Sequence, residues 1–215
     1  MAFERTGAAG RWAAVIVVVL VVGAGVGFLQ TRDDRPSVLL VGDSITAISE
    51  RLVTDELHGD YRVLTSGAPK RRADERVHDL PLLVATKPDA VVVNLGTNDV
   101  IQHTDLAATA KAIEKIGGAF PTERCVILVT VNQNMYSASD ARLGPDAVAV
   151  NRLIVALAAR RGWTLVRWDE IVHRYIAEGE PNGHLSVDTI HPRPIGQKLL
   201  ADAYRRALKP CLAAK

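Results

Sequence analysis

The chain has 215 residues, enough for one domain of ordinary size, and its 26 basic and 24 acidic side chains give a formal net charge of +2. Because these charges are spread along the chain, no field strong enough to concentrate a polyanion is expected, which argues against nucleic acid as a partner. Aromatic residues make up only 5% of the chain, so we expect an aliphatic core of buried strands and amphipathic helices.

An apolar run from Trp12 to Leu29 carries no charged side chain and is long enough to cross a bilayer. A cleavable signal peptide with a small-residue site at Val22-x-Ala24 is the alternative. We prefer an uncleaved anchor, because apolar residues continue past Ala24 to Leu29. The expected layout is a short cytoplasmic N-terminus (1–11), a transmembrane anchor or signal segment (12–29), a linker (30–36) and one folded domain (37–215). That domain would lie outside the cytoplasm, held at the membrane by the helix or secreted after cleavage.

After residue 36, short apolar runs alternate with longer amphipathic ones, which is typical of successive β-α units. We expect strands at 37–41, 61–65, 90–94, 125–131 and 164–168. Helices are expected at 45–57, 74–86, 106–116, 147–161, 170–177 and 194–208, the second of them kinked or split by Pro81. Right-handed crossovers place such helices on both faces of the sheet. The expected fold class is therefore α/β, a three-layer α/β/α sandwich with a mainly parallel, five-stranded, flavodoxin-like sheet.

The first β-α loop reads Gly42-Asp43-Ser44, directly after a buried strand and before a helix. Ser44 is either the N-cap of that helix or a nucleophile exposed on a tight turn. Gly42 permits a sharp turn, and the helix N-terminus supplies N–H groups for a developing oxyanion. The position is therefore suited to nucleophilic chemistry.

Two other strand ends place candidate donors at the same edge of the sheet. Asn98, in Gly96-Thr97-Asn98-Asp99, can donate toward a substrate carbonyl or bond its own loop. The N–H of Gly67 is the second candidate donor. The loop 132–145 should lie over this edge, either as a solvated connection or with Asn134 and Tyr136 as substrate contacts.

Near the C-terminus, Asp188 and His191 stand three residues apart in Asp188-Thr189-Ile190-His191-Pro192. In a turn, the carboxylate can accept the imidazole Nδ1–H and leave Nε2 facing a nucleophile. Pro192 biases His191 away from helical backbone angles and keeps it on a loop. His184, on the same loop, is the only serious competitor for this role.

The two cysteines, Cys125 and Cys211, cannot build a zinc site by themselves. Cys125 opens an expected strand and Cys211 follows the last expected helix, at ends that are able to meet. Either the two residues form a disulfide, which is consistent with an oxidising compartment outside the cytoplasm, or both are buried free thiols.

From about Ser37 to Leu208 these motifs resemble, in order, those of the SGNH hydrolases, also called GDSL-type esterases. Gly42-Asp43-Ser44 resembles the first block with its nucleophilic serine, and Gly67 falls where the oxyanion glycine of the second is expected. Gly96-Thr97-Asn98-Asp99 is similar to the third block and Asp188-x-x-His191 to the last. One departure is that the usual second glycine after Gly67 is absent.

The resemblance implies a catalytic triad of Ser44, His191 and Asp188, and an oxyanion hole formed by the N–H groups of Ser44 and Gly67 and the side chain of Asn98. It also implies a serine-dependent acyl-ester hydrolase that works through an acyl-enzyme without a metal or other cofactor. With an exported domain, acylated cell-envelope glycans or lipids are the expected substrates. The alternatives are an O-acyltransferase that passes the acyl group to a sugar hydroxyl and a non-catalytic envelope-binding module.

Overall fold

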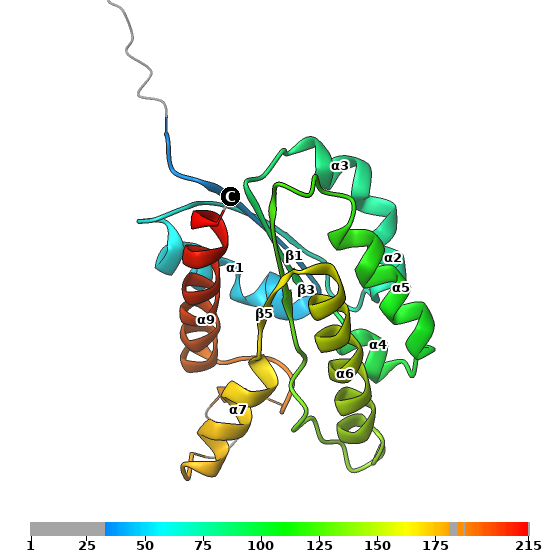
Figure 1. The fold of residues 1–215 in the computed structure, drawn as a ribbon. Coiled ribbons are helices and arrows are strands. Elements are labelled where there is room, and N and C mark those ends of the chain that lie inside the picture. The colour runs from blue at the N-terminus through cyan, green and yellow to red at the C-terminus, as the bar shows by residue number, and fades with distance from the viewer. Residues whose placement is uncertain (1–32, 181–184, 187, 215) are drawn as a thin grey trace, which may run out of the picture. The chain divides into compact units, whose positions relative to one another are not determined.

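The computed structural model describes residues 33–180, 185–186 and 188–214, which include one α/β unit (Figure 1). The expected membrane segment at 12–29 lies outside these residues. Within the described ranges, no helix combines the length and the apolar character needed to span a membrane.

Five parallel strands form one sheet in the order β2-β1-β3-β4-β5. This is the flavodoxin-like order, in which the chain changes direction across the sheet between β1 and β3. Gly42 at the end of β1 pairs with Gly67 of β2 on one side and with Asn94 of β3 on the other, so the three strand ends lie level. The strands are β1 (Ser37–Gly42), β2 (Arg62–Gly67), β3 (Ala90–Asn94), β4 (Cys125–Val129) and β5 (Thr164–Val166).

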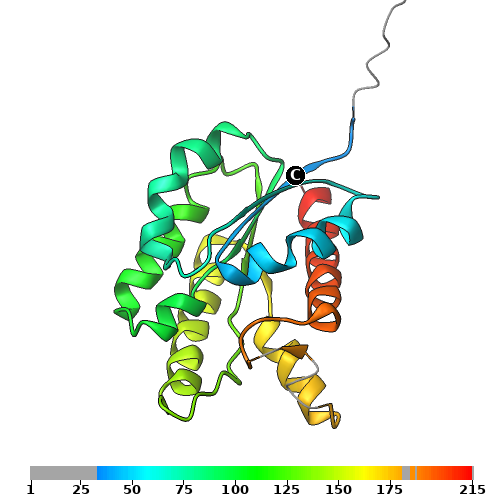
Figure 2. The same ribbon diagram turned by 180° about the vertical axis from the view of Figure 1, so that it is seen from behind.

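Helices cover both faces of this sheet, which confirms the expected α/β/α layering (Figures 1 and 2). One face carries α1 (Ser44–Leu57), α7 (Trp168–Ala177) and α9 (Pro194–Ala213). The other carries α2 (Ala73–Arg76), α3 (Leu80–Ala85), α4 (Thr97–Ile101), α5 (Leu106–Gly117) and α6 (Leu143–Arg161).

The side chains of β1 alternate between two buried apolar clusters, one on each face of the sheet. Val38 and Leu40 pack in the cluster with α1, α7 and α9, while Leu39 and Val41 pack in the cluster with α5 and α6. A strand with both faces buried needs apolar residues at every position. This explains why β1 and β3 are visible in the sequence as continuous aliphatic runs.

The expected helix at 74–86 is divided into α2, a 3₁₀ turn (Val77–Asp79) and α3, which confirms the predicted split; Pro81 lies in the first turn of α3, where its missing N–H is harmless. Other element boundaries differ from the sequence-based prediction. Helix α6 begins at Leu143, so the loop after β4 is shorter than expected. The short helix α4 was not expected, because Gly-Thr-Asn-Asp is a composition typical of turns.

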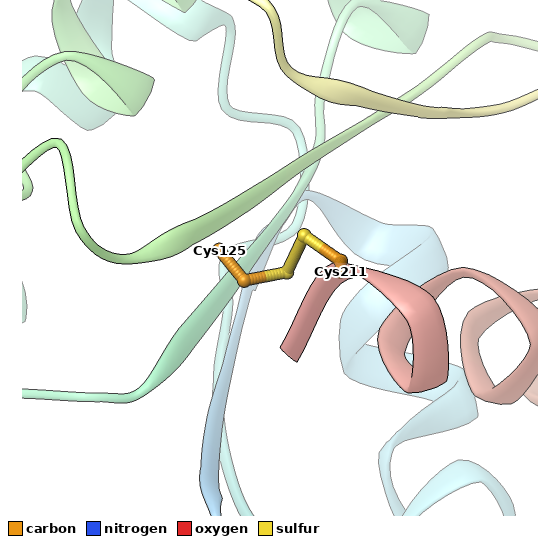
Figure 3. The surroundings of a disulfide bond; sticks show 2 residues. All are labelled: Cys125 and Cys211. Carbon is orange, nitrogen blue, oxygen red and sulfur yellow. A yellow bond between two sulfur atoms is a disulfide. The ribbon is translucent and has the colours of Figure 1, made fainter. Parts of the chain in front are cut away.

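Cys125 and Cys211 form a disulfide that joins the start of β4 to α9 (Figure 3). The prediction that Cys211 follows the last helix is wrong, since α9 continues past Pro210 to Ala213 and contains the cysteine. A second link lies nearer the N-terminus of the same helix, where the side-chain amide of Asn94 in β3 donates to the buried Tyr204 hydroxyl (3.0 Å). Helix α9, which follows His191 in the chain, is thus held to the sheet at two levels.

Candidate active site

Ser44 is the first residue of α1 and lies at the carboxyl end of β1. The N-cap of α1 is Asp43, whose Oδ1 accepts the Ile45 N–H (2.9 Å), so the interpretation of Ser44 as the cap is wrong. A Cβ on Gly42 would lie 1.9 Å from Thr46 Oγ1, which means that only glycine fits this turn. Because Asp43 satisfies the helix end, the Ser44 hydroxyl is available for another partner.

That partner is His191, from the loop that precedes α9. Ser44 Oγ lies 2.9 Å from His191 Nε2, and His191 Nδ1 lies 2.7 Å from Asp188 Oδ2. The carboxylate can only accept, so Nδ1 carries a proton, and Nε2 of the neutral ring is left to accept the hydroxyl hydrogen of Ser44. The structure therefore brings together the three residues that the sequence motifs single out.

The two oxygens of Asp188 act on different parts of the same turn. While Oδ2 faces the imidazole, Oδ1 accepts the N–H groups of Ile190 (3.0 Å) and His191 (2.7 Å). Partial burial raises the pKa of the Asp188 carboxyl, but the hydrogen bonds from His191 and Ile190 outweigh burial and hold this pKa below its usual value. A charged carboxylate thus both shapes the turn and orients the ring.

Asn98 lies in the first turn of α4, at the carboxyl end of β3. Its side chain is only 6% exposed, and its Nδ2 has no hydrogen-bond partner among the described residues. The neighbouring Asp99 has a structural role instead, since its carboxylate accepts from the Ala73 N–H (3.0 Å) and the Thr109 hydroxyl (3.1 Å). A buried amide without a partner is costly unless a bound group completes it, so Asn98 is a candidate oxyanion donor.

Gly67 ends β2 beside Gly42. A Cβ at Gly67 would lie 2.4 Å from the Ala47 backbone nitrogen, so the close packing of α1 on this strand requires glycine. The preceding residue, Ser66, is held by Arg76 of α2, whose guanidinium donates to the Ser66 carbonyl (2.8 Å) and hydroxyl (2.6 Å). Arg76 is 5% exposed and was not predicted, because a buried arginine in a short helix has no distinctive sequence signal.

The loop after β4 lies against the turn that carries Asp188 and His191. Asn132 donates from its side chain to the Thr189 carbonyl (2.7 Å), and the Tyr136 N–H donates to the Thr189 hydroxyl (2.9 Å). The Tyr136 residue is 69% exposed, whereas Asn134 is partly buried with its N–H donating to Asn132 Oδ1 (2.9 Å). Both candidate substrate contacts are therefore on a loop that touches the candidate catalytic turn.

The other electrostatic features of the site are burial effects. Asp43 is fully buried, and burial raises the pKa of its carboxyl from 3.8 to about 6.

The competing histidine, His184, lies outside the described residues. Within the part of the chain that the structure describes, no group of three or more His, Cys, Asp and Glu residues is arranged to hold a metal ion.

This arrangement can perform nucleophilic acyl transfer. A hydroxyl at a helix start is bonded to an imidazole, and a carboxylate fixes the orientation of that imidazole. The ring is thus placed to remove the hydroxyl proton as Ser44 attacks a carbonyl carbon. The positive end of α1 and the Asn98 amide lie at the same strand edge, where negative charge on the carbonyl oxygen would develop.

Solved structures with this fold include a lipase/acylhydrolase and an acetylxylan esterase. The lipase/acylhydrolase from Enterococcus faecalis is 21% identical with a TM-score of 0.70, covering 81% of this chain and 96% of its own. The acetylxylan esterase Axe2 from Geobacillus stearothermophilus is 18% identical with a TM-score of 0.68, covering 80% and 94%. TesA is 26% identical with a TM-score of 0.66, covering 81% and 99%. Comparison with curated protein sequences gives no match.

A family model describes most of the domain. The model of the GDSL-like lipase/acylhydrolase family matches residues 40–199, a segment that begins within β1 and ends within α9. It contains every residue of the candidate site described above. The chain therefore belongs to the GDSL-like lipase/acylhydrolase family and is an SGNH-type esterase.

Proposed function

We propose that the protein hydrolyses acyl esters through an acyl-enzyme on Ser44. His191 takes the Ser44 proton as Oγ attacks the ester carbonyl and returns it to the leaving alcohol. Water then attacks the acyl-enzyme, with His191 acting in the same two ways. The observation that carries the proposal is the unbroken chain of contacts from Ser44 Oγ to His191 Nε2 (2.9 Å) and from His191 Nδ1 to Asp188 Oδ2 (2.7 Å).

In this mechanism the tetrahedral oxyanion is bound by three donors: the N–H groups of Ser44 and Gly67 and the side chain of Asn98. The unpartnered Nδ2 of Asn98 supports its assignment, because the oxyanion would supply the acceptor that this buried amide lacks. One such donor typically lowers the barrier by about 3 kcal/mol. The two glycines at the strand ends, Gly42 and Gly67, let the first turns of α1 pack this close to the strands, because a Cβ at either position would meet Thr46 or Ala47.

For the substrate, we propose a short acyl ester on an exported cell-envelope glycan or lipid. Carbohydrate acetyl esters are suggested by the likeness to Axe2, an acetylxylan esterase. A position outside the cytoplasm is supported by the Cys125–Cys211 disulfide, because such bonds persist mainly in oxidising compartments. The apolar run 12–29 would hold the domain at the membrane.

The test uses the full-length chain in detergent micelles with an activated acetyl ester. Ser44→Ala and His191→Ala should each lower kcat by at least about 10³-fold. His173→Ala, which removes an exposed histidine from α7, is the matched control and should keep the wild-type rate. Ester turnover that survives Ser44→Ala would refute the mechanism.

Two further measurements address the substrate and the location. Adding an acylated glycan and a sugar acceptor distinguishes hydrolysis, which releases the free acid, from transfer, which forms a new sugar ester.

Protease added outside sealed cells should digest the domain after residue 36. A domain that is protected until the membrane is broken would place it in the cytoplasm and contradict this location.

A further inference from the structure

Thr189, between the two candidate catalytic residues of the last loop, has an unusual backbone conformation. Its φ angle of +64° lies in the left-handed region, which a β-branched side chain rarely adopts. Such a conformation is unfavourable and persists only where surrounding contacts impose it. Here the hydrogen bonds that Asp188 accepts within this turn are joined by contacts from outside the catalytic triad.

Three hydrogen bonds from the loop after β4 hold Thr189. The Asn132 amide donates to the Thr189 carbonyl (2.7 Å), and the Tyr136 N–H donates to the Thr189 hydroxyl (2.9 Å). That hydroxyl in turn donates to the Tyr136 carbonyl (3.3 Å). We call Thr189, the Asn132 side chain and the Tyr136 backbone the clamp.

The clamp is anchored in the core. Asn132 is 4% exposed, and its Oδ1 accepts the N–H of Asn134 (2.9 Å), so its amide has a fixed direction. The preceding residue, Val131, is held from α6 by the buried Asn151, whose side chain accepts the Val131 N–H (2.8 Å) and donates to its carbonyl (2.9 Å). The turn that contains His191 is therefore connected to α6 through the clamp and Asn151.

The left-handed residue matters because it reverses the chain between Asp188 and His191. With this backbone, Asp188 Oδ1 reaches the His191 N–H (2.7 Å) while Oδ2 reaches Nδ1 of the same residue (2.7 Å). If Thr189 relaxed to an ordinary negative φ, the imidazole would turn relative to the carboxylate. The contact between His191 Nε2 and Ser44 Oγ would then lengthen.

We propose that Thr189 and Asn132 are positioning residues that set the direction of the His191 imidazole through the clamp, an inference that rests on the proposed esterase function. Neither residue needs to touch the substrate. Their loss should lower the rate of attack by Ser44 and leave substrate binding intact. A displacement of about 1 Å in a reacting group can cost roughly 10²-fold in rate.

The test compares Thr189→Val, which keeps the side-chain shape but loses the hydroxyl, with Thr189→Ser, which keeps the hydroxyl. Asn132→Ala removes the other side-chain bond. Thr86→Val is the matched control, because the Thr86 hydroxyl donates to the Leu83 carbonyl (2.7 Å) near the end of α3, outside the clamp. Two rates are measured on the full-length chain: ester turnover, and labelling of Ser44 by a fluorophosphonate.

For Thr189→Val and Asn132→Ala we expect kcat and the labelling rate to fall about 10- to 100-fold, with KM within about twofold of the wild type. Thr189→Ser should recover to within about threefold of the wild type, and Thr86→Val should match it. A labelling rate in Thr189→Val or Asn132→Ala equal to that of the wild type would overturn the clamp. So would a change confined to KM, since it would indicate a substrate contact.

Failure of the proposed function gives a different result. A wild type that the fluorophosphonate labels but that hydrolyses no ester would refute the esterase function, while the labelling rates would still decide the clamp. If Thr189→Val does not fold, as shown by loss of its thermal transition, Asn132→Ala decides. Labelling of that variant at the wild-type rate would overturn the inference.

Discussion

Replacing Asp43 by asparagine should change how the stability of this protein depends on pH. Asp43 is fully buried beside Ser44, and its Oδ2 has no hydrogen-bond partner among the described residues. Burial raises the pKa of this carboxyl from 3.8 to about 6. Asparagine keeps an oxygen for the Ile45 N–H at the N-cap but carries no charge at any pH.

The sign follows from linkage. An acid whose pKa is higher in the folded state than in the unfolded state stabilises the fold most while it is protonated, below about pH 4. This contribution is lost as the pH rises from about 4 to about 6, because the unfolded state releases the proton first. A difference of about two pH units corresponds to ~3 kcal/mol, at 1.36 kcal/mol for each unit. Above about pH 6 the wild type carries this full cost, and the Asp43→Asn variant does not.

The assay is urea unfolding of both proteins between about pH 3 and pH 8. The free energy of unfolding of Asp43→Asn minus that of the wild type should rise by ~3 kcal/mol across this range. Any pH-independent cost of the new amide cancels in this comparison. A difference that stays flat, or that falls as the pH rises, would refute the reasoning.

Asp89→Asn provides a control of opposite sign. The Asp89 carboxylate accepts from the backbone and side chain of Ser37 and pairs with Arg124, and these contacts hold its pKa below the usual value. A lowered pKa stabilises the fold at higher pH and is lost as the pH falls. The free energy of unfolding of Asp89→Asn minus that of the wild type should therefore decrease as the pH rises.

Three other predictions concern the site and the disulfide. Asn98→Ala should lower kcat about 10²- to 10³-fold with little change in KM in steady-state kinetics, and an unchanged kcat would remove Asn98 from the oxyanion hole. Asp188→Asn should lower kcat by about 10³-fold or more in the same assay without abolishing folding, and full activity would show that the carboxylate is dispensable. Reducing the Cys125–Cys211 bond, which spans 86 residues, should lower the free energy of unfolding by about 4–5 kcal/mol; an unchanged urea midpoint would contradict this.

The features that could be predicted from the sequence are those with local causes. Strands β1, β3 and β4 are buried along their whole length, and each is visible in the sequence as a continuous aliphatic run. The partly exposed edge strands β2 and β5 were also predicted, from their place in the β-α alternation. The positions of Ser44 and Asn98 near one edge followed from parallel topology, since the carboxyl ends of parallel strands share an edge. His191 follows no strand, and its prediction rested on the Asp188-x-x-His191 motif. The membrane segment at 12–29 and its orientation remain predictions.

The features that the sequence did not show depend on contacts between distant segments. Nothing near Arg76 in the sequence indicates that its guanidinium is buried against Ser66. The left-handed conformation of Thr189 is imposed from Asn132, 57 residues away in the chain, and a threonine is a poor local signal for it. Asp43, rather than Ser44, caps α1. The sequence alone does not distinguish the two, because both adjacent residues have side chains that can cap a helix.

The loop that carries Asp188 and His191 is fixed at its base as well as at its tip. Ser186 and Pro192 form an isolated antiparallel bridge, and the Arg193 N–H donates to the Leu185 carbonyl (2.6 Å). A Cβ on Gly196 would lie 2.4 Å from that same carbonyl oxygen, so α9 can begin this close only with glycine.

The base of the loop therefore depends on the placement of α9, which the Cys125–Cys211 bond secures from the opposite end of the helix. The tip depends on the clamp from the loop after β4. Because a catalytic imidazole must be held to within a fraction of an ångström, two independent supports are physically reasonable for a residue on a loop. Loss of the clamp should therefore lower the rate of the reaction with Ser44 more than it lowers the free energy of unfolding, whereas loss of the disulfide should lower both.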